Sequence, residues 1–274
     1  MSYYNRVCAI DVSPDIRVTD LKIKFEIKKS LTADKNYCRV DIYNLSEATR
    51  NRITNDINSL VRVQAGYLEN VGLVEIGQGN ISNVIHSFKT PDIITTIYAK
   101  DGFRATRRNN ISLSFVEKTP LDSIIKAIIG KLDLPVKFVD YDKSALLNGG
   151  FSHIGSIPDA LNQLALQFNF SWSIQNGQVL ITGLNKSTGR QTVVLSASTG
   201  LIENPEKIIK TKELALTSRY EYKVTSLLQP QLEISDLIKI ESKTLNGVFI
   251  INEFQHIGDT RGNDWYTNMI VAKN

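Results

Sequence analysis

The sequence predicts a mainly β protein with an α+β insert, in which two small β-barrel domains flank a small α/β domain. Isoleucine and other β-branched residues are heavily used, which favours pleated, half-buried strands. Short segments with a period of two fill both ends of the chain, and helical spacing occurs only in the middle. We therefore expect a first barrel over residues 1–112, an α/β domain over 113–184 and a second barrel over 185–274.

The composition narrows the class of protein. A chain of 274 residues with 42% hydrophobic and 22% charged residues is too apolar to be disordered. The two cysteines, Cys8 and Cys38, are too few for a disulfide scaffold. The first residues lack a leader pattern, and no apolar run reaches the ~20 residues of a membrane helix, so no stable membrane insertion is expected. A net charge of +4, from 32 basic and 28 acidic residues, is too small to indicate a dedicated nucleic-acid binder.

The first domain is expected to contain mostly antiparallel strands. In residues 21–28 the odd-numbered residues are apolar and the even-numbered residues are charged, so one face is buried. A short helix is expected to begin at Ser46, whose hydroxyl can accept from free backbone N–H groups. Cys8 and Cys38 fall on inward positions. Further strands are expected at 7–12, 37–43, 60–66, 72–77, 79–86 and 92–99.

The middle domain is expected to run helix, strand, helix, hairpin. Thr119–Asp122 starts the first helix with a capping hydroxyl, a proline at the first helical position and an acid in the first turn. An extended piece follows at 136–139, and Ser156 opens the second helix. Asn176-Gly177, which favours a type I′ turn, joins the two strands of the hairpin at 170–174 and 179–182.

Strands return in the last domain, and Asn246-Gly247 is expected to form a hairpin turn there. The expected strands are 191–196, 213–226, 236–241, 247–257 and 264–272.

One stretch stands out for its charge. From Ser144 to Asn185 the only charged residue is Asp159. This pattern fits a well-buried central unit. It also fits a surface that meets another subunit, because interface cores lack charge and keep aromatic residues such as Trp172. The sequence leaves both interpretations open.

Motifs for catalysis or cofactor binding are weak. His86, His153 and His256 are far apart and lack metal-ligand spacing, so no metal site is expected. Ser152 lacks the Gly-x-Ser-x-Gly elbow of a nucleophile. Lys186-Ser187 is not preceded by a phosphate-binding glycine loop. We expect no cofactor.

Two charged clusters suggest alternative functions. Asp259 and Asp264 could act as the carboxylate pair of a cell-wall-degrading enzyme, although the residues around them are typical of a hairpin loop. Arg104, Arg107 and Arg108 could contact phosphate, as in a nucleic-acid-binding or carbohydrate-binding barrel module. Such a cluster is more often a solvated loop or the rim of a protein contact.

Several segments, in their order along the chain, resemble the baseplate hub proteins of contractile-tailed phages, the late control protein D family. The resemblance spans nearly the whole chain. It rests on Leu21–Ser30, Val40–Ser46, Thr119–Leu121, Gly155–Leu164, Phe170–Ile174, Thr199–Ile202, Val224–Pro230 and His256–Gly262.

The resemblance implies a structural protein that is not an enzyme. Such a hub is a homotrimeric ring that adapts a six-fold tail tube to a three-fold central spike and lines the DNA exit channel. Its implied partners are the tail tube protein, the spike and other baseplate proteins, with DNA only in transit and no small-molecule substrate. It is implied to assemble in the host bacterial cytoplasm and to reside in the virion tail baseplate.

A further alternative is a component of a tail tip or of a type VI-like secretion device, which would rest on the same physical arguments and differ only in its partners. The strand pattern runs almost to Asn274, so any part that cuts or pierces the envelope is expected to be a separate protein.

Subunit or tube contacts are expected in the loops at Arg104–Asn110 and Gly258–Trp265. We expect Trp265→Ala to impair assembly more than the isolated fold. The candidate interface residues are Arg104, Arg107, Arg108, Trp172, Asp259, Arg261 and Trp265.

Overall fold

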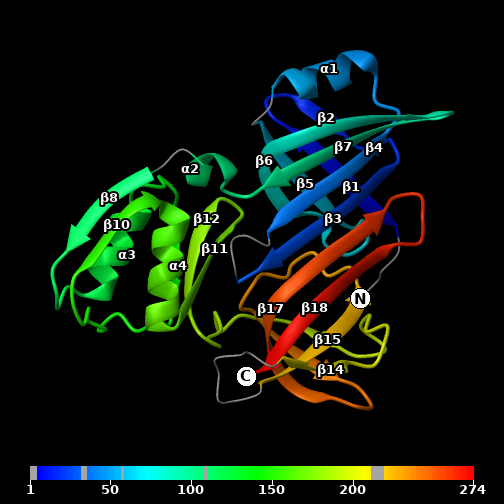
Figure 1. The fold of residues 1–274 in the computed structure, drawn as a ribbon. Coiled ribbons are helices and arrows are strands. Elements are labelled where there is room, and N and C mark those ends of the chain that lie inside the picture. The colour runs from blue at the N-terminus through cyan, green and yellow to red at the C-terminus, as the bar shows by residue number, and fades with distance from the viewer. Residues whose placement is uncertain (1–4, 32–35, 57–58, 108–109, 211–218) are drawn as a thin grey trace.

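A computed structural model describes residues 5–31, 36–56, 59–107, 110–210 and 219–274 of the chain. The protein is mainly β, as expected. Figure 1 shows three parts: an N-terminal β region (residues 6–100), a middle unit of helices and small sheets (103–183) and a C-terminal β region (191–273). Within the described residues no helix is long and apolar enough to span a membrane.

The N-terminal β region follows the predicted alternation closely. In β3 the odd-numbered positions from Ile23 to Ile27 are buried and the even-numbered ones are half-exposed. Cys8 and Cys38 lie in the same apolar core, and burial raises the pKa of each thiol to about 12, so both stay protonated. The elements are β1 (Arg6–Val12), β2 (Ile16–Val18), β3 (Ile23–Ser30), β4 (Tyr37–Tyr43), α1 (Glu47–Asn55), β5 (Leu60–Tyr67), β6 (Gly72–Lys89) and β7 (Asp92–Lys100).

Residues 72–86 form one long strand instead of the two expected. The first half of β6 pairs with β5 up to Asn80, and the second half pairs with β7 from Asn80 to Lys89, with a shift of register between Ile81 and Asn83. Gly79 is needed at this close approach, because a Cβ there would lie 2.7 Å from the backbone carbon of Lys100. The break expected between the strands at 72–77 and 79–86 is therefore a site of tight packing inside one strand.

The middle unit has its own apolar core, formed by both helices and by strands on either side of them. The expected order of helix, strand, helix and hairpin is confirmed, but a pairing of β8 with β10 was not predicted. Its signal was present, because Ile111, Leu113 and Phe115 alternate with serines. The elements are α2 (Phe103–Arg107), β8 (Asn110–Phe115), α3 (Leu121–Ile129), β9 (Val136–Val139), β10 (Phe151–Ser156), α4 (Ile157–Phe168), β11 (Phe170–Gln175) and β12 (Gln178–Gly183).

The expected helix caps are correct in two of three cases. The Ser46 hydroxyl accepts from the Thr49 N–H at 3.1 Å, and the Ser156 hydroxyl accepts from the Asp159 N–H at 3.2 Å. The expected cap at Thr119 is wrong. Its hydroxyl donates to the backbone carbonyl of Val116, and α3 starts after Pro120 without a side-chain cap.

The C-terminal β region packs around a third apolar core, to which the middle unit contributes Val139 and Leu180. The expected turn at Asn246-Gly247 is wrong, because the chain reverses earlier, where the Ser242 N–H donates to the carbonyl of Leu245. Residues 213–218 of one expected strand lie outside the described residues. The strands are β13 (Gln191–Leu195), β14 (Glu206–Lys210), β15 (Arg219–Leu227), β16 (Leu237–Glu241), β17 (Asn246–Asp259) and β18 (Trp265–Lys273).

The two β regions share one sheet. β3 pairs antiparallel with β17, with Ile27 opposite His256, and this pairing joins thirteen strands of the described chain into one hydrogen-bonded sheet. In Figure 1 the blue β3 lies directly beside the orange β17. The main path through the described strands is open and ends at β2 and β14, and a branch from β17 through β16 ends at β13. The expected two separate barrels are thus not closed in the described residues, because β3 uses an edge to pair across the boundary.

Candidate interaction site

The tip of the β11–β12 hairpin reaches the N-terminal β region. Asn176 and Gly177 have φ angles of 51° and 73°, and Gln175 pairs with Gln178, as the Asn-Gly dipeptide predicts for a tight turn. The N–H of Gly177 donates to the Asp101 carboxylate at 2.9 Å, just beyond β7. The hairpin tip is therefore bound to a neighbouring part of the molecule, in addition to closing its own two strands.

The same hairpin is bound to the end of β3. The Lys29 ammonium donates to the side-chain oxygen of Asn176 at 2.6 Å. The Gln175 amide donates to the carbonyl of Ser30 at 2.8 Å. Asn36 donates to the carbonyl of Ile174 at 2.9 Å. These contacts are polar and largely buried, so they fix the position of the hairpin more specifically than an apolar contact would.

Lys29 is the unusual member of this set, because its side chain is only 7% exposed. Burial lowers the pKa of Lys29, and the neighbouring Asp101 acts in the opposite direction. Burial also raises the pKa of Asp101, although the hydrogen bond from the Gly177 backbone acts to lower it. Sequence reasoning overlooked Lys29. Its burial could have been predicted, because position 29 continues the odd-numbered, inward-facing series of β3.

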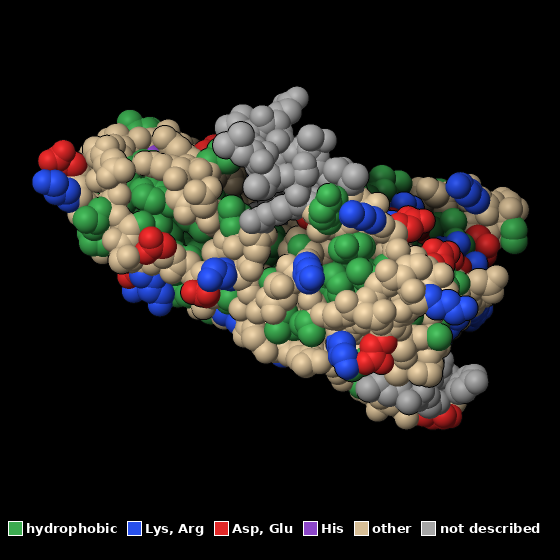
Figure 2. All heavy atoms as spheres, turned by 90° about the horizontal axis from the view of Figure 1, so that it is seen from below, with side chains coloured by type: hydrophobic (Ala, Val, Ile, Leu, Met, Phe, Trp, Pro, Cys, Tyr) green, Lys and Arg blue, Asp and Glu red, His purple; other side chains and the backbone are tan. Residues whose placement is uncertain are grey.

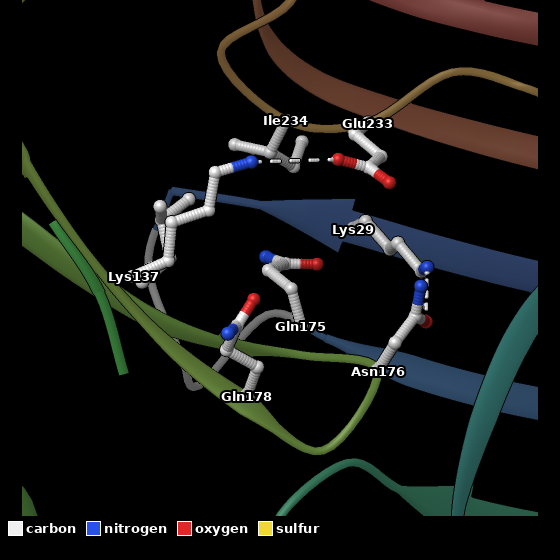
Figure 3. A pocket seen from close by; sticks show the side chains of 8 residues that line it. Lys29, Lys137, Gln175, Asn176, Gln178, Glu233 and Ile234 are labelled. Atoms are coloured by element: carbon white, nitrogen blue, oxygen red, sulfur yellow. Dashed lines mark hydrogen bonds and ion pairs between the residues drawn. The ribbon is translucent and has the colours of Figure 1, made fainter. Parts of the chain in front are cut away.

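A partly enclosed pocket of about 130 Å³ lies beside Lys29, where the three parts of the molecule meet. Figure 3 shows the amides of Gln175 and Gln178 pointing into the space between Lys29 and Lys137, with Glu233 and Ile234 on the opposite side. Lys137 and Glu233 form an ion pair at 3.8 Å. The lining residues are Lys29, Lys137, Gln175, Asn176, Gln178, Leu180, Glu233 and Ile234.

The expected arginine cluster is partly described. Arg104 and Arg107 are exposed on α2, a five-residue helix where a loop was expected. The guanidinium of Arg107 lies 5.4 Å from the centre of the Phe103 ring. Arg108 lies outside the described residues. Both described arginines are accessible to a partner, and their role as contacts stays a prediction.

The turn between β17 and β18 is stabilised by Asp259. Its carboxylate accepts from the N–H of Arg261 at 2.9 Å and lies 3.2 Å from the ammonium of Lys24. Burial alone would raise the pKa of Asp259, but the Arg261 N–H and the lysines Lys24 and Lys22 outweigh it and the pKa is lowered. A carboxylate held ionised in this way fixes a turn and is unsuited to the role of general acid.

Arg261 and Asp264, in the same turn, are exposed. The guanidinium of Arg261 donates to the carbonyl of Asp20 at 3.0 Å, and the carbonyl of Asp264 accepts from the N–H of Asp259 at 2.8 Å. Both contacts hold the turn against neighbouring backbone. Arg261 is the surface residue of this turn that stays a candidate for subunit contact.

The two tryptophans are inside the protein, which corrects their assignment as surface contacts. Trp265 has no exposed surface and packs edge-on against Phe25, with ring centres 5.3 Å apart. Trp172 is buried in the middle unit and donates from its ring nitrogen to Asn162 at 2.8 Å. Loss of either ring would act on the fold itself, so the expected effect of Trp265→Ala on assembly alone does not follow.

The weakly charged stretch from Ser144 to Asn185 is in part a buried core and in part an exposed apolar surface, so each of the two interpretations describes part of it. Leu161 and Leu164 are fully buried, whereas Ile154 and Leu166 are 87% and 85% exposed. Figure 2 shows apolar side chains open to solvent on the middle unit, at the left of the view. A surface that combines exposed apolar side chains with few charges has the character of an interface core.

The histidines have structural surroundings. His86 bonds to Thr54 and Thr95, and His256 is buried with its Nδ1 2.9 Å from the Thr267 hydroxyl. Burial lowers the pKa of His256 to about 3, so the ring is neutral at physiological pH. Within the described ranges, no group of three or more His, Cys, Asp and Glu side chains is placed to hold a metal ion.

Comparison with known proteins gives one family match. The model of the family described as baseplate hub gp41 matches residues 7–271. No curated protein sequence matches the chain.

Solved structures share the fold at low sequence identity. The 43 kDa tail protein of prophage MuSo2 from Shewanella oneidensis is 11% identical, with a TM-score of 0.68 over 98% of this chain and 97% of that one. A tail protein from Neisseria meningitidis MC58 is 10% identical, with a TM-score of 0.65 over 99% and 97%. The E. coli c3393 protein, a type VI secretion component described as similar to T4 gp27 and gp5, is 10% identical, with a TM-score of 0.65 over 97% and 76%.

Proposed function

The chain belongs to the baseplate hub gp41 family over residues 7–271, and we propose that it forms the central ring of a phage tail. Membership gives it a structural role in the tail baseplate of a virion. In the proposed ring three copies adapt the six-fold tail tube to the three-fold spike and line the channel through which DNA leaves. Assembly would precede virion release, in the host bacterial cytoplasm.

The family match carries this proposal, and the sheet supports its geometry. Each chain has two β regions, so three copies would present six β regions to a six-fold tube. The described sheet path ends at β2 and β14, and an unpaired strand edge is a template for a strand of another chain. Together with β13, where the branch of the sheet through β16 ends, these edges are suited to closing a ring by addition of strands between neighbours.

Three apolar cores support a division into functional parts at about the boundaries predicted, residues 1–112, 113–184 and 185–274. In this proposal the two β regions build the ring and the middle unit contacts other baseplate proteins. Its exposed Ile154 and Leu166 favour a weakly charged partner surface.

The alternatives have less support. The cell-wall-degrading enzyme was suggested by Asp259 and Asp264, yet Asp259 is tied to Arg261 and Lys24 within a turn. The binding-module hypothesis depends on Arg104 and Arg107, which are exposed but lie on one short helix. A type VI-like device shares the fold of the E. coli protein and differs from a phage hub in its partners.

Light scattering of the full chain at several concentrations tests the proposal, alone and after mixing with the tube and spike proteins from the same genome. The expected mass is that of three chains, either free or within the mixed complex. Mixing with an unrelated phage's tube protein is the control. A mass that stays at one chain in every mixture would contradict the ring.

A further inference from the structure

We propose that the outer edge of β8, in the two-stranded sheet of the middle unit, takes up an extended, uncharged segment of another baseplate protein as a third strand. The inference rests on the proposed function, in which the middle unit contacts such proteins, and it adds the place of contact and the chemistry of the partner. β8 pairs with β10 over Asn110–Phe115, and this sheet contains no other described strand.

The outer edge of β8 has unused backbone groups. Successive residues of a strand direct their N–H and C=O groups alternately to its two sides, so an edge strand leaves half of them free. Among the described residues, the backbone of Asn110–Phe115 makes no hydrogen bond other than those with β10. Figure 1 shows β8 at the outer margin of the middle unit, on the side away from the two β regions. The edge is therefore open to a strand from outside the chain.

This edge lacks the features that usually prevent strand addition. Natural edge strands are protected by charged side chains, prolines, bulges or a very short length. β8 has six residues with no charge and no proline, and its register with β10 is continuous. On the other side of the sheet, β10 contains Gly155 at a φ of 152°, which departs from an extended strand. The unprotected edge is thus that of β8, as expected of a strand that has a partner.

The side chains of β8 define what a third strand would carry. Leu113 and Phe115 are half-buried against the core of the middle unit. Ser112 and Ser114 are exposed on the opposite face, where Ile154, paired with Ser112, is 87% exposed. Side chains of adjacent strands lie side by side, so a partner with an apolar residue at every second position would cover the rest of Leu113 and Phe115. A charged residue in the middle of that segment would lose water beside uncharged neighbours.

Charge is expected at one end of the partner segment. Arg104 and Arg107 are exposed on α2 and form no ion pair with a described carboxylate. Arg107 lies three positions before Asn110, so the chain holds it within about 11 Å of the start of β8. Beyond the other end, Glu117 and Lys118 have opposite charges. An acidic residue at the end of the segment that meets α2 would therefore be attracted, and the same charge at the other end would gain little.

A second copy of this chain fits the edge less well. Its main sheet path ends at β2, which carries Arg17, and at β14, which carries Glu206 and Lys207. Burying those charges beside the serines of β8 would cost free energy. The expected partner is therefore a different protein, and a second copy is an outcome of the test.

Hydrogen exchange of the full chain, alone and in purified tails, tests the proposal. We expect the amides of β8 that do not bond to β10 to exchange at least ten-fold more slowly in the tail than in the chain alone. Ser112→Lys, which puts a charge on the exposed face of β8, should remove this protection. Ser152→Lys, which puts the same charge on the exposed face of β10, is the matched control and should keep it. Circular dichroism checks that both variants fold.

Cross-linking identifies the occupant. Ser112→Cys can be labelled with a benzophenone maleimide, because Cys8 and Cys38 are buried and stay unlabelled. In the tail we expect an adduct with one segment of another tail protein, with no charge over the six positions beside β8 and an acid at the end nearer α2.

Three results would overturn the proposal. They are an adduct with a second copy of this chain or with a segment charged along its length, β8 amides that exchange equally in the two states, and equal loss of protection in both lysine variants. Absence of the chain from purified tails would instead refute the proposed function. The ring is tested separately by a mass of three chains, so a failure at β8 leaves it standing.

Discussion

Two buried side chains, Lys29 and Trp265, make contacts near the two ends of β3. Trp265 comes from the last strand of the chain, yet its ring packs on Phe25 in the apolar core of the N-terminal β region. Lys29 at the other end is polar and hydrogen-bonded to the hairpin of the middle unit. Single residues thus join parts of the chain that are far apart in sequence.

Trp265→Ala should lower the free energy of unfolding by about 3–5 kcal/mol, because a large ring is removed from a core that cannot fill the space. Urea denaturation of the purified chain measures this. Tyr266→Ala, the half-exposed neighbour, is the control and should cost clearly less. An unchanged urea midpoint for Trp265→Ala would show that the ring does not stabilise the core.

The lowered pKa of Asp259 gives a pH dependence with a defined sign. Since the folded-state pKa lies below the ordinary value of 3.8, the ionised carboxylate stabilises the fold above that pH, and the contribution is lost as the pH falls through the lowered value. Asp259→Asn should therefore cost roughly 1 kcal/mol at pH 7 and progressively less in acid. Urea unfolding at pH 7 and pH 3.5 measures the difference, with Asp264→Asn as the exposed control. A penalty that grows in acid would refute this sign.

At the scale of elements, local patterns specified most strands and the three longer helices, α1, α3 and α4, whereas contacts distant in sequence could not be inferred. The alternation in β3 and the Asn176-Gly177 turn follow from neighbouring residues. The pairing of β3 with β17 joins residues about 230 positions apart, and no local pattern encodes which edge a strand selects. The pocket depends on that placement, so the sequence did not predict it, although the inward position of Lys29 was visible.

The helix caps provide a test at this scale. Ser156→Ala should destabilise the chain by about 1 kcal/mol, since the hydroxyl satisfies a free N–H at the start of α4. Thr119→Ala should cost less, because that hydroxyl bonds to Val116 and does not cap α3. Thermal or urea unfolding of both variants measures the contrast. Equal losses would mean that Thr119 does act as a cap.

The three cores predict different behaviour for isolated fragments. A fragment of residues 103–186 should unfold cooperatively, because its core is contributed almost entirely by its own residues. Residues 1–112 alone should not, because Phe25 loses Trp265 and β3 loses its partner β17. Circular dichroism melting and the dispersion of amide NMR signals distinguish the two. A cooperatively folded 1–112 fragment would refute the dependence on the C-terminal strands.

At the scale of the whole molecule, one sheet spans both β regions, and the middle unit is attached to it through the polar contacts of a hairpin. A continuous sheet resists bending between the two β regions, which suits a rigid ring. The unit attached beside it is free to present its weakly charged surface to other baseplate proteins. This division of roles follows from the proposed hub function and from the arrangement in Figure 1.

Electron cryomicroscopy of the intact tail, reconstructed without imposed symmetry, tests the central claim most directly. The account predicts density for three copies of this chain in a ring between the last tube layer and the spike, with six β regions facing the tube. Absence of the chain from that position, or a number of copies other than three, would contradict it.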